Sequence, residues 1–543
     1  MSERIEIYDT TCRDGAQALD VKLELDDKIR IARLDDTMGI HVVELGYPAS
    51  NHTDRQVFNA LNERPLRHTK VAAFGMTRRK GVAAEEDEML QTLVDVPADI
   101  VTIVGKSSRF QVEQVLSATP EENLRMIDET VRYLRQQGKD RILFDAEHFF
   151  DGWYGTKHRH GIPESYQYPG DPEYAMRTLE TAVEAGAQGV VHCDTNGYST
   201  PEQVFEATES VRRQLGNVMI GIHPHNDRGL ATANMLAAVR AGARHVQATW
   251  GDIGERSGNL GIETAMMNLK LEGYDIPDTR QLTYASEEAA SFTRKEADPC
   301  KPFVGRNAFV HKGGMHASGM ERLPAAYEGM PPETVGNRRI IVGSEQAGLA
   351  SIRSVVERLT VVPEKLRSEI LASQNLQRAI LAAVKERESG GISFDRADAS
   401  MTLLVLETVG GYKRLIGDID SEVTERLRRV TRATIEVQIN GTGETYHEVA
   451  RGGGPLGSLD TALRKALVQH RPELKNHRLI GYRTKLPSAS HGGTSSVIQV
   501  LMECTDGQDH WHTTGAHASS TTAGWDALLD SYEYMLLKNA HRA

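Results

Sequence analysis

The chain has 543 residues, too many for a single hydrophobic core, so its length predicts two to four domains. Hydrophobic residues make up 39% of the chain and charged residues 25%, a composition typical of globular proteins. The net charge of −12 and the pI of about 5.9 argue against a general affinity for nucleic acid or for an anionic membrane surface. No apolar stretch reaches the roughly 18 residues that a membrane-spanning helix needs.

The N-terminal residues and the cysteines predict where the protein works. The chain enters a strand pattern at once and shows no signal-peptide core. Its four cysteines, Cys12, Cys193, Cys300 and Cys504, lie far apart and have no CxxC spacing. We therefore expect neither a disulfide framework nor a cysteine-type zinc site, and we expect the protein in a reducing cytoplasm.

The first 275 residues repeat one unit, in which a short β-branched run is followed by a helical pattern that often ends at glycine. Eight such units predict an α/β fold, a (β/α)8 TIM barrel. A doubly wound open sheet is the weaker alternative, because no Gly-rich dinucleotide fingerprint follows the first strand. We expect the strands at 5–11, 41–48, 70–77, 99–106, 141–148, 189–197, 218–227 and 245–252.

Two histidines one residue apart, His223 and His225, close the seventh predicted strand. Side chains alternate along a strand, so both imidazoles point to the same side and suit one metal ion. Two ordinary hydrogen-bonding histidines are the alternative when the pair is taken alone.

Polar side chains stand at the ends of other predicted strands as well, where a TIM barrel carries its active site. The loop GDIGERSGN follows the eighth strand. Two imidazoles, a carboxylate and an amide oxygen form a suitable ligand set for a divalent cation. The residues expected to meet at the mouth of the barrel are Arg13, Asp14, Glu44, Glu147, Asp194, Thr195, Asn196, His223, His225, Glu255 and Asn259.

The pattern changes after the barrel. Residues 276–390 are predicted to form a mainly helical linker subdomain that contributes to the active site, and the Gly- and His-rich loop GRNAFVHKGGMHASGM interrupts its helices. Residues 391–543 are predicted to form an α+β domain with an internal repeat. A strand, a Gly turn, a second strand, a small-residue loop and a helix occur there twice in the same order, although chance similarity of two such units is the alternative.

Four motifs, YDTTCRDGAQ, HPHNDRGLATAN, GERSGN and HKGGMH, resemble those of the acyltransferases that condense acetyl-CoA with a 2-oxo acid. This family comprises the 2-isopropylmalate, homocitrate and citramalate synthases, and its metal-dependent barrel also occurs in hydroxymethylglutaryl-CoA lyase. The resemblance covers nearly the full length. The C-terminal repeat, with GGGPLGSLDTALRKAL, is similar to the allosteric domain of the leucine-pathway member. The resemblance implies a homodimer, an amino-acid effector and acetyl-CoA as co-substrate.

Three further stretches, FDAEHFFDGW, FGMTRRKG and ERLPAAYEG, are most similar to the long citramalate synthases of the family. They imply pyruvate as the 2-oxo acid, (R)-citramalate as the product and a place in isoleucine biosynthesis. ELGYPASN is closer to the isopropylmalate synthases, so 2-oxoisovalerate and leucine biosynthesis remain the alternative. A lyase suits the C-terminal domain less well, because feedback belongs to a committed biosynthetic step. A non-catalytic, metal-bearing sensor of a small acid is the third alternative.

The resemblance implies that Asp14, His223, His225 and Asn259 bind a divalent metal ion, which is Mn, Mg or Zn. From the residues alone, Asp14 can also be a turn residue and Asn259 a helix cap. Arg13 resembles the arginine beside the substrate carbonyl, where a cation stabilises the alkoxide, and a surface ion pair is its alternative.

Other residues resemble those that bind substrate or move protons. Thr195 is expected to hydrogen-bond the carboxylate of the oxo acid, unless it is only a turn hydroxyl. Glu147 and His316 are the candidate bases for the weakly acidic methyl group of acetyl-CoA, assisted by Tyr327. His316 follows the barrel sequence, so it must reach the mouth from the second domain of the same chain or of a partner subunit. Glu44 either orients Arg13 or is a simple strand-end carboxylate.

Overall fold

The structure is a computed structural model of the chain, and it divides into two compact units. The first unit comprises Met1–Val310 and Pro324–Arg339, and the second comprises His311–Leu323 and Ile340–Ala543. Within the part of the chain that is described, no helix is both long and apolar enough to span a membrane. The described residues are 3–311, 319–320, 322–341, 349, 352–353, 355–357, 359, 361–394, 397–425, 430–439, 444–486 and 496–542.

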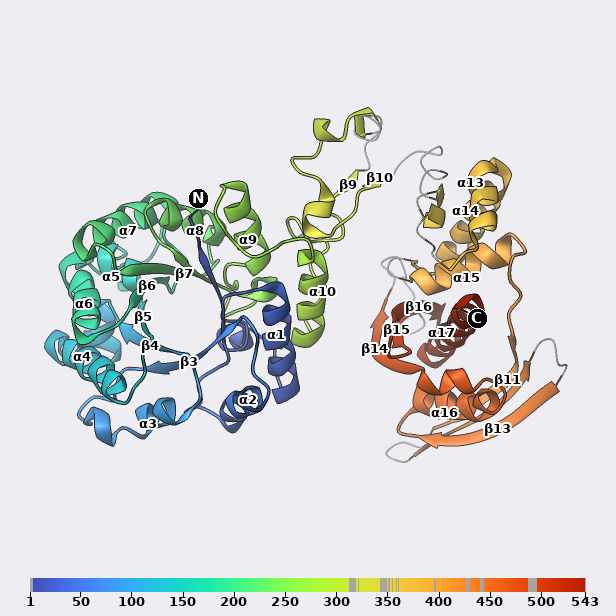
Figure 1. The fold of residues 1–543 in the computed structure, drawn as a ribbon, viewed down its shortest axis with the longest axis horizontal. Helices are drawn as coiled ribbons and strands as arrows, with labels where there is room; N and C mark the ends of the chain where they lie inside the picture. Colours follow the sequence, from blue (N-terminus) through green and yellow to red (C-terminus); the bar gives the residue numbers. More distant parts are fainter. Residues whose placement is uncertain are drawn as a thin grey trace. The chain divides into compact units, whose positions relative to one another are not determined.

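The first unit is a closed barrel of eight parallel strands in chain order, with helices around its outside (Figure 1). This confirms the predicted TIM barrel, and each of the eight expected runs contains one strand. The strands are rich in buried apolar residues because both of their faces are covered. They are β1 (Glu6–Asp9), β2 (Val42–Glu44), β3 (Lys70–Met76), β4 (Ile100–Lys106), β5 (Ile142–Glu147), β6 (Gly189–Asp194), β7 (Met219–Pro224) and β8 (His245–Ala248).

Several barrel helices begin and end at the signals expected from the sequence. In α6, the Asp171 side chain accepts a hydrogen bond from the Tyr174 amide, and the helix stops at Gly186, where φ is +114°. The helices of this unit are α1 (Leu25–Met38), α2 (His52–Glu63), α3 (Glu88–Asp95), α4 (Pro120–Gln136), α5 (Phe149–Tyr154), α6 (Pro172–Ala185), α7 (Pro201–Leu215), α8 (Ala231–Arg240), α9 (Ile262–Leu271) and α10 (Leu282–Thr293).

Several short elements connect the longer helices and strands of the described residues. A two-stranded sheet consists of β9 (Val310–His311) and β10 (Ile340–Ile341). The single-turn elements are η1 (Gly15–Gln17), η2 (Ala84–Glu86), η3 (Gln111–Val115), η4 (Glu164–Tyr166), η5 (Trp250–Asp252), η6 (Pro324–Ala326), η7 (Pro332–Val335) and η8 (Pro472–Asn476).

The second unit contains two antiparallel three-stranded sheets, each followed by a helix. The predicted repeat is therefore present, but each copy has three strands where the sequence pattern predicted two. In the second copy the additional strand, β14, is exposed along nearly its whole length, so it lacks the alternation that marks a strand. The elements are α13 (Glu364–Ala372), α14 (Gln374–Ser389), α15 (Asp398–Thr408), β11 (Ile416–Thr424), β12 (Thr431–Ile439), β13 (Glu444–Gly452), α16 (Pro455–Val468), β14 (Arg478–Lys485), β15 (Ile498–Thr505), β16 (His510–His517) and α17 (Ser520–Arg542).

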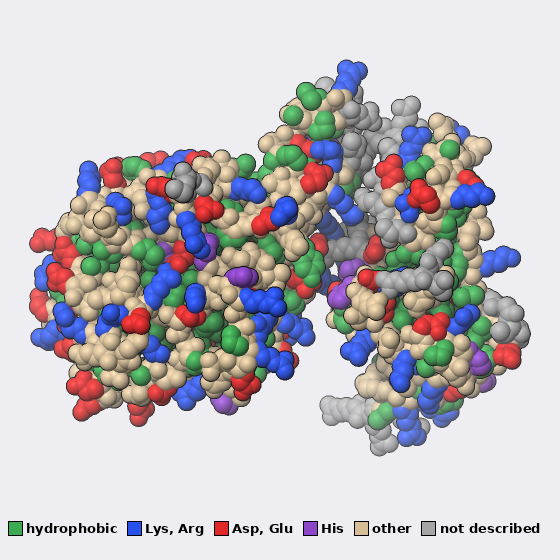
Figure 2. Space-filling view, viewed as in Figure 1, with side chains coloured by type: hydrophobic (Ala, Val, Ile, Leu, Met, Phe, Trp, Pro, Cys, Tyr) green, Lys and Arg blue, Asp and Glu red, His purple; other side chains and the backbone are tan. Residues whose placement is uncertain are grey.

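Each unit has its own large hydrophobic core. The core of the second unit joins residues of both sheets, such as Val437 and Val500, with Ile370 of α13 and Ile380 of α14. On the surface, Figure 2 shows basic and acidic side chains interspersed over the visible face of the barrel, as the moderate net charge predicts.

Candidate active site

Three buried side chains meet at the mouth of the barrel. Asp14 follows β1, His223 lies in β7, and His225 comes directly after that strand. The Nε2 atoms of His223 and His225 lie 3.4 Å and 3.8 Å from Oδ2 of Asp14. Their potential ligand atoms all lie within 4.8 Å of one another, so the three side chains are able to bind one metal ion.

Asn259 joins this cluster from the loop after β8. Its backbone forms a bridge with His225, and its side-chain amide donates a hydrogen bond to Oδ2 of Asp14. Oδ1 of Asn259 and Nδ1 of both histidines are buried and have no hydrogen-bond partner among the described residues. Turning the amide by half a rotation exchanges its oxygen and nitrogen, which places the oxygen toward Asp14. A carboxylate, two imidazoles and an amide oxygen thus fit a divalent cation.

The charges of the cluster favour the protonation state that a metal ligand needs at Asp14 and at His225, but not at His223. Burial opposes ionisation of Asp14, but the Arg13 guanidinium and a hydrogen bond with His223 hold its pKa well below the usual range. Burial and the neighbouring His223 lower the pKa of His225 to about 3, so this ring is neutral at pH 7. For His223, burial lowers the pKa, but the contact with Asp14 outweighs it and raises the pKa.

Arg13 is fixed between two carboxylates and an aromatic ring. Its Nη1 donates to Asp14 at 2.8 Å and its Nε to Glu44 at 2.6 Å. The guanidinium carbon lies 4.1 Å from the centre of the Phe74 ring, at a distance typical of a cation–π contact. Only 12% of the Arg13 side chain is exposed, so the pair is not a surface ion pair. The sequence did not decide whether Glu44 orients Arg13. In the structure Glu44 contacts Arg13 directly and accepts a hydrogen bond of 2.7 Å from the Tyr8 hydroxyl.

Glu147 and Thr195 lie at the ends of neighbouring strands. Glu147 ends β5, and its Oε2 lies 2.5 Å from Nζ of Lys106, the last residue of β4. Thr195 follows β6, and its hydroxyl oxygen accepts a hydrogen bond of 2.8 Å from the His148 amide. As an acceptor in this contact, the Thr195 hydroxyl keeps its own proton for another group.

The remaining two predicted residues come from the chain after the barrel. His316 lies outside the described residues. Tyr327 follows η6, and 42% of its surface is exposed. The roles of both stay predictions.

Sequence reasoning missed Lys106 and Phe74, which contact predicted site residues. Lys106 ends the apolar run DIVTIVGK, and a cation at the carboxyl end of a barrel strand was the available signal. Phe74 gave no such signal, because an aromatic residue inside a strand is usually part of the core.

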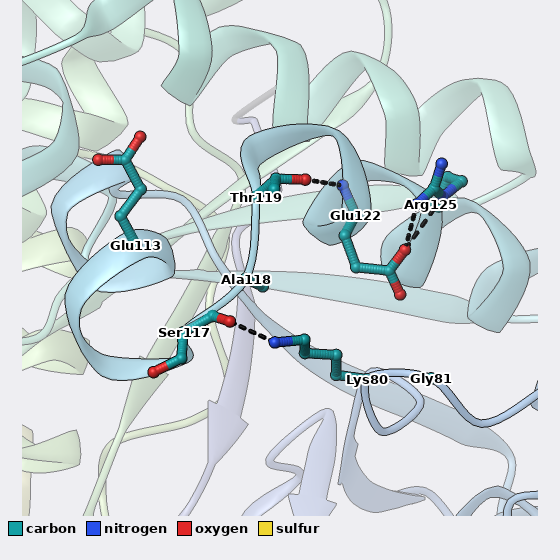
Figure 3. Close-up of a pocket in the computed structure, with 8 residues that line it drawn as sticks. All are labelled: Lys80, Gly81, Glu113, Ser117, Ala118, Thr119, Glu122 and Arg125. Atoms are coloured by element: carbon teal, nitrogen blue, oxygen red, sulfur yellow. Dashed lines mark hydrogen bonds and ion pairs between the residues drawn. The ribbon is translucent and has the colours of Figure 1, made fainter.

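A separate hollow of about 610 Å³ lies by the loops after β3 and β4 (Figure 3). Its polar groups contact one another: Lys80 donates to the Ser117 carbonyl, Arg125 pairs with Glu122 at 2.5 Å, and the Thr119 hydroxyl caps the Glu122 amide. None of the predicted catalytic residues lines this hollow. The lining residues are Lys80, Gly81, Glu113, Ser117, Ala118, Thr119, Glu122 and Arg125.

Comparison with known proteins gives matches along nearly the whole chain. The HMGL-like family matches residues 4–288, the homocitrate synthase post-HMGL domain-like family residues 303–377, and the LeuA allosteric (dimerisation) domain residues 395–536. The chain is 38% identical to the (R)-citramalate synthase of Aquifex aeolicus, with 99% of each chain covered. It is 39% identical to the (R)-citramalate synthase of Synechocystis sp., over 98% of this chain and 96% of that one.

The chain belongs to the (R)-citramalate synthase family. The motifs had indicated this family, and the comparison confirms it. A 2-isopropylmalate synthase of Bradyrhizobium sp. is 28% identical over 99% of this chain and 95% of its own, a lower identity than either citramalate synthase shows.

Proposed function

We propose that this chain condenses acetyl-CoA with pyruvate and hydrolyses the thioester, giving (R)-citramalate and CoA for isoleucine biosynthesis. The observation that carries the proposal is the cluster of Asp14, His223, His225 and Asn259 beside Arg13, in a chain similar over its full length to (R)-citramalate synthases. The reaction is that of an acyltransferase that turns the acyl group into an alkyl group on transfer.

Asp14, His223, His225 and Asn259 are the residues that would hold the divalent cation, which is Mn, Mg or Zn. A cation held by these residues would supply Lewis-acid polarisation of the carbonyl group of the 2-oxo acid. Arg13, hydrogen-bonded to Asp14 and Glu44, places a fixed positive charge where the carbonyl oxygen becomes an alkoxide. The Thr195 hydroxyl binds the carboxylate of the oxo acid.

Glu147 and His316 are the candidates for removing a proton from the acetyl methyl group, with Tyr327 assisting. The methyl group is a very weak acid, so the base must be held against it. The resulting carbanion equivalent attacks the carbonyl carbon of pyruvate. Water then hydrolyses the thioester, and this last step makes the overall reaction effectively irreversible.

An aromatic wall beside Arg13 supports pyruvate as the substrate. The Phe74 ring lies against Arg13, and Tyr47 packs edge-on against Phe74 with 6.0 Å between the ring centres. Tyr47 belongs to ELGYPASN, the stretch that is closer to the isopropylmalate synthases, so this stretch reaches, through Phe74, the predicted site residue Arg13. Two aromatic rings leave less room for a branched oxo acid than for a methyl group.

The test of the proposal is release of CoA thiol from acetyl-CoA with pyruvate and, in parallel, with 2-oxoisovalerate. We expect a higher kcat/KM for pyruvate and a single (R)-enantiomer of citramalate by chiral chromatography. Discrimination between apolar side chains is worth only ~1–3 kcal/mol, so a lower rate with the branched acid is expected too. A higher kcat/KM for 2-oxoisovalerate would instead assign the chain to leucine biosynthesis. If neither acid gives thiol release, the non-catalytic sensor of a small acid is the remaining alternative.

Two features of the second unit support the proposal that the protein is a homodimer regulated by an amino acid. This amino acid is isoleucine if the product is citramalate. The match of residues 395–536 to an allosteric (dimerisation) domain is the first support. The second is a cavity of about 220 Å³ whose walls combine Arg387 and Asp526 with apolar residues such as Phe394 and Leu404. Groups of both charges suit a zwitterion, and the apolar wall suits a branched side chain.

The reducing cytoplasm stays the proposed location. All four cysteines are free thiols in the structure, and three of them are buried. This agrees with a protein that does not depend on disulfides.

A further inference from the structure

The proposed reaction develops negative charge on two different oxygens in succession. The thioester oxygen becomes negative when the acetyl methyl group loses its proton, and the pyruvate carbonyl oxygen becomes negative when the new carbon–carbon bond forms. Preorganised donors aimed at such oxygens are worth several kcal/mol in a closed site. Arg13 lies 2.8 Å from Asp14, within the predicted metal cluster, so it serves the pyruvate oxygen. The thioester oxygen needs a donor of its own, near the base.

Lys106 is the cation that stands beside a candidate base. Lys106 and Glu147 are paired neighbours on the parallel strands β4 and β5, and each ends its strand. Nζ of Lys106 lies 2.5 Å from Oε2 of Glu147, and 22% and 29% of the two side chains are exposed. Both side chains therefore belong to the carboxyl-terminal face of the barrel, where active sites of this fold lie.

The Lys106 ammonium has more hydrogen-bond donors than its contact with Glu147 uses. It carries three N–H groups, and among the described residues Glu147 is the only side chain seen to pair with it. A partly exposed ion pair adds little to stability, so folding alone gives a weak reason for this lysine. The rival explanation is that Lys106 only holds the Glu147 carboxylate in place, and a double-mutant cycle distinguishes the two roles.

We propose that Lys106 is a catalytic residue whose ammonium donates a hydrogen bond to the thioester oxygen of acetyl-CoA and stabilises the enolate. This inference rests on the proposed condensation of acetyl-CoA with pyruvate. The methyl proton passes to the base, Glu147 or His316. The electron pair of the broken C–H bond forms the new C=C bond, and the carbonyl π pair moves to the oxygen that Lys106 contacts. When the enolate carbon attacks pyruvate, this pair returns and the thioester carbonyl is restored, so the step needs no oxidant or reductant.

The first measurement compares Lys106→Met and Lys106→Arg with the wild-type enzyme. Met has a similar length but no N–H group, so we expect kcat to fall by roughly 10²-fold or more, the usual loss for one oxyanion donor. Arg keeps a donor and is expected to restore part of the rate. The KM for pyruvate and the binding of Mn²⁺ are expected to stay unchanged. With trideuterated acetyl-CoA, the isotope effect on kcat/KM should be larger in Lys106→Met, because proton removal becomes the slower step.

The decisive measurement is a double-mutant cycle with Glu147→Gln. If Lys106 acted only through Glu147, adding Lys106→Met to Glu147→Gln would cost no further activity. We expect a further loss of at least roughly tenfold, because the thioester oxygen loses its donor in both backgrounds. No further loss in the double variant would overturn the proposal and leave Lys106 as a positioning residue.

Lys80→Met is the matched control. Lys80 lies in the loop after the neighbouring strand β3 and contacts the Ser117 carbonyl in the hollow of Figure 3. We expect its kcat and isotope effect to equal those of the wild type, and an equal loss in both lysine variants would refute a specific role for Lys106. If the wild-type enzyme makes citramalate and Lys106→Met keeps its full rate, only the Lys106 proposal fails. If the wild-type enzyme makes no citramalate, the proposed function itself fails.

Discussion

Asp14 is the residue on which the predicted metal site depends. It is buried, it accepts hydrogen bonds from Arg13 and Asn259, and both histidine Nε2 atoms lie near it. A buried carboxylate that is held ionised by a guanidinium is costly to build unless its charge is used. Its chemistry therefore points to a function rather than to stability.

Asp14→Asn is expected to keep the shape of the site and remove its negative charge. Because a carboxylate ligand is lost, Mn²⁺ affinity should fall by roughly tenfold or more, measured by titration calorimetry. Asp128→Asn is the matched control, since Asp128 pairs with Arg132 on an exposed helix face and lies outside the cluster. Unchanged Mn²⁺ affinity in Asp14→Asn would remove this residue from the ligand set.

Two buried carboxyl groups interact with each other: Asp9, the last residue of β1, and Asp35 of α1. Asp9 accepts a hydrogen bond of 2.7 Å from the Thr11 amide, and the Trp250 indole donates to Asp35 at 2.8 Å. Burial raises the pKa of Asp9 to about 6, and burial together with the Asp9 charge raises the pKa of Asp35 well above its usual value. The folded pair therefore retains a proton at pH 7 that the unfolded chain has released.

This difference makes stability depend on pH. The unfolded carboxyls lose their protons near about pH 4, so the folded state binds more protons above that pH, and the free energy of unfolding falls as pH rises toward the raised pKa values. Asn at position 35 resembles the protonated acid, because its amide accepts from Trp250 and donates to Asp9. We expect the Tm of Asp35→Asn, relative to wild type, to rise from about pH 5 to about pH 8. Asp35→Leu, which leaves the Trp250 N–H without an acceptor, should have a lower Tm throughout. A pH-independent Tm difference in Asp35→Asn would contradict the shared proton.

The sequence predicts some of these residues and not others for a physical reason. His223 and His225 follow from strand alternation, which is a local rule, and Arg13 and Asp14 follow from a contiguous motif. The contact of Arg13 with Glu44 joins residues 31 positions apart, and Lys106 with Glu147 depends on the pairing of β4 and β5. Such contacts require the closed barrel, so the sequence alone left the contact of Arg13 with Glu44 as one of two alternatives and did not reveal that of Lys106 with Glu147.

At the scale of elements, the loop after β8 is held by a cluster of charges around the buried Lys301. Nζ of Lys301 lies 3.0 Å from Asp252 and 2.9 Å from the fully buried Glu263. The carbonyl of Asp252 accepts the Asn259 amide at 3.0 Å, so the cluster also fixes the backbone of a predicted metal ligand. Lys301 comes from the segment after α10 and ties that segment to the barrel loop.

Lys301→Met is expected to destabilise the barrel by roughly 3–5 kcal/mol, because it leaves the fully buried Glu263 carboxylate without its cation. The loop that carries Asn259 should then be less ordered, so Mn²⁺ affinity should fall as well. Lys70→Met is the control, since Lys70 forms an exposed pair with Asp99 at 3.4 Å. Urea unfolding followed by Trp fluorescence and Mn²⁺ titration give the two readouts. Equal stability of the two variants would show that the cluster does not support the loop.

The elements themselves were mostly predictable, because the barrel strands are contiguous apolar runs between helix signals. Strand β14 was not predictable, because its residues are nearly all exposed and show no alternation of apolar and polar side chains. An exposed strand is specified by its pairing with β15, and that pairing is a tertiary contact between segments on either side of a long connection.

At the scale of the whole molecule, the two cores separate catalysis from the domain proposed to regulate it. The helices α13 and α14 lie before the predicted border at residue 391, yet Ile370, Ile380 and Val384 contribute to the core of the second unit. Ending the chain near residue 388 would expose these side chains to water. Arg339, the last residue of the first unit, is therefore the better end for a shortened chain.

Allosteric inhibition requires that isoleucine bind the active and inactive states with different affinity. We expect isoleucine, and leucine more weakly, to lower the rate of the full chain, and we expect residues 1–339 to show no response to either amino acid.

Asp526→Asn tests the cavity within the full chain, because Asp526 is the exposed carboxylate of its wall and is placed to meet the α-ammonium group. Its basal rate should equal that of wild type while the inhibition constant for isoleucine rises by roughly tenfold, the cost of one charged hydrogen bond. Glu422→Gln, an exposed charge change on β11, is the control and should leave inhibition unchanged. If isoleucine still inhibits residues 1–339, the effector binds at the barrel; if neither amino acid changes the rate of the full chain, the second unit is not a feedback domain.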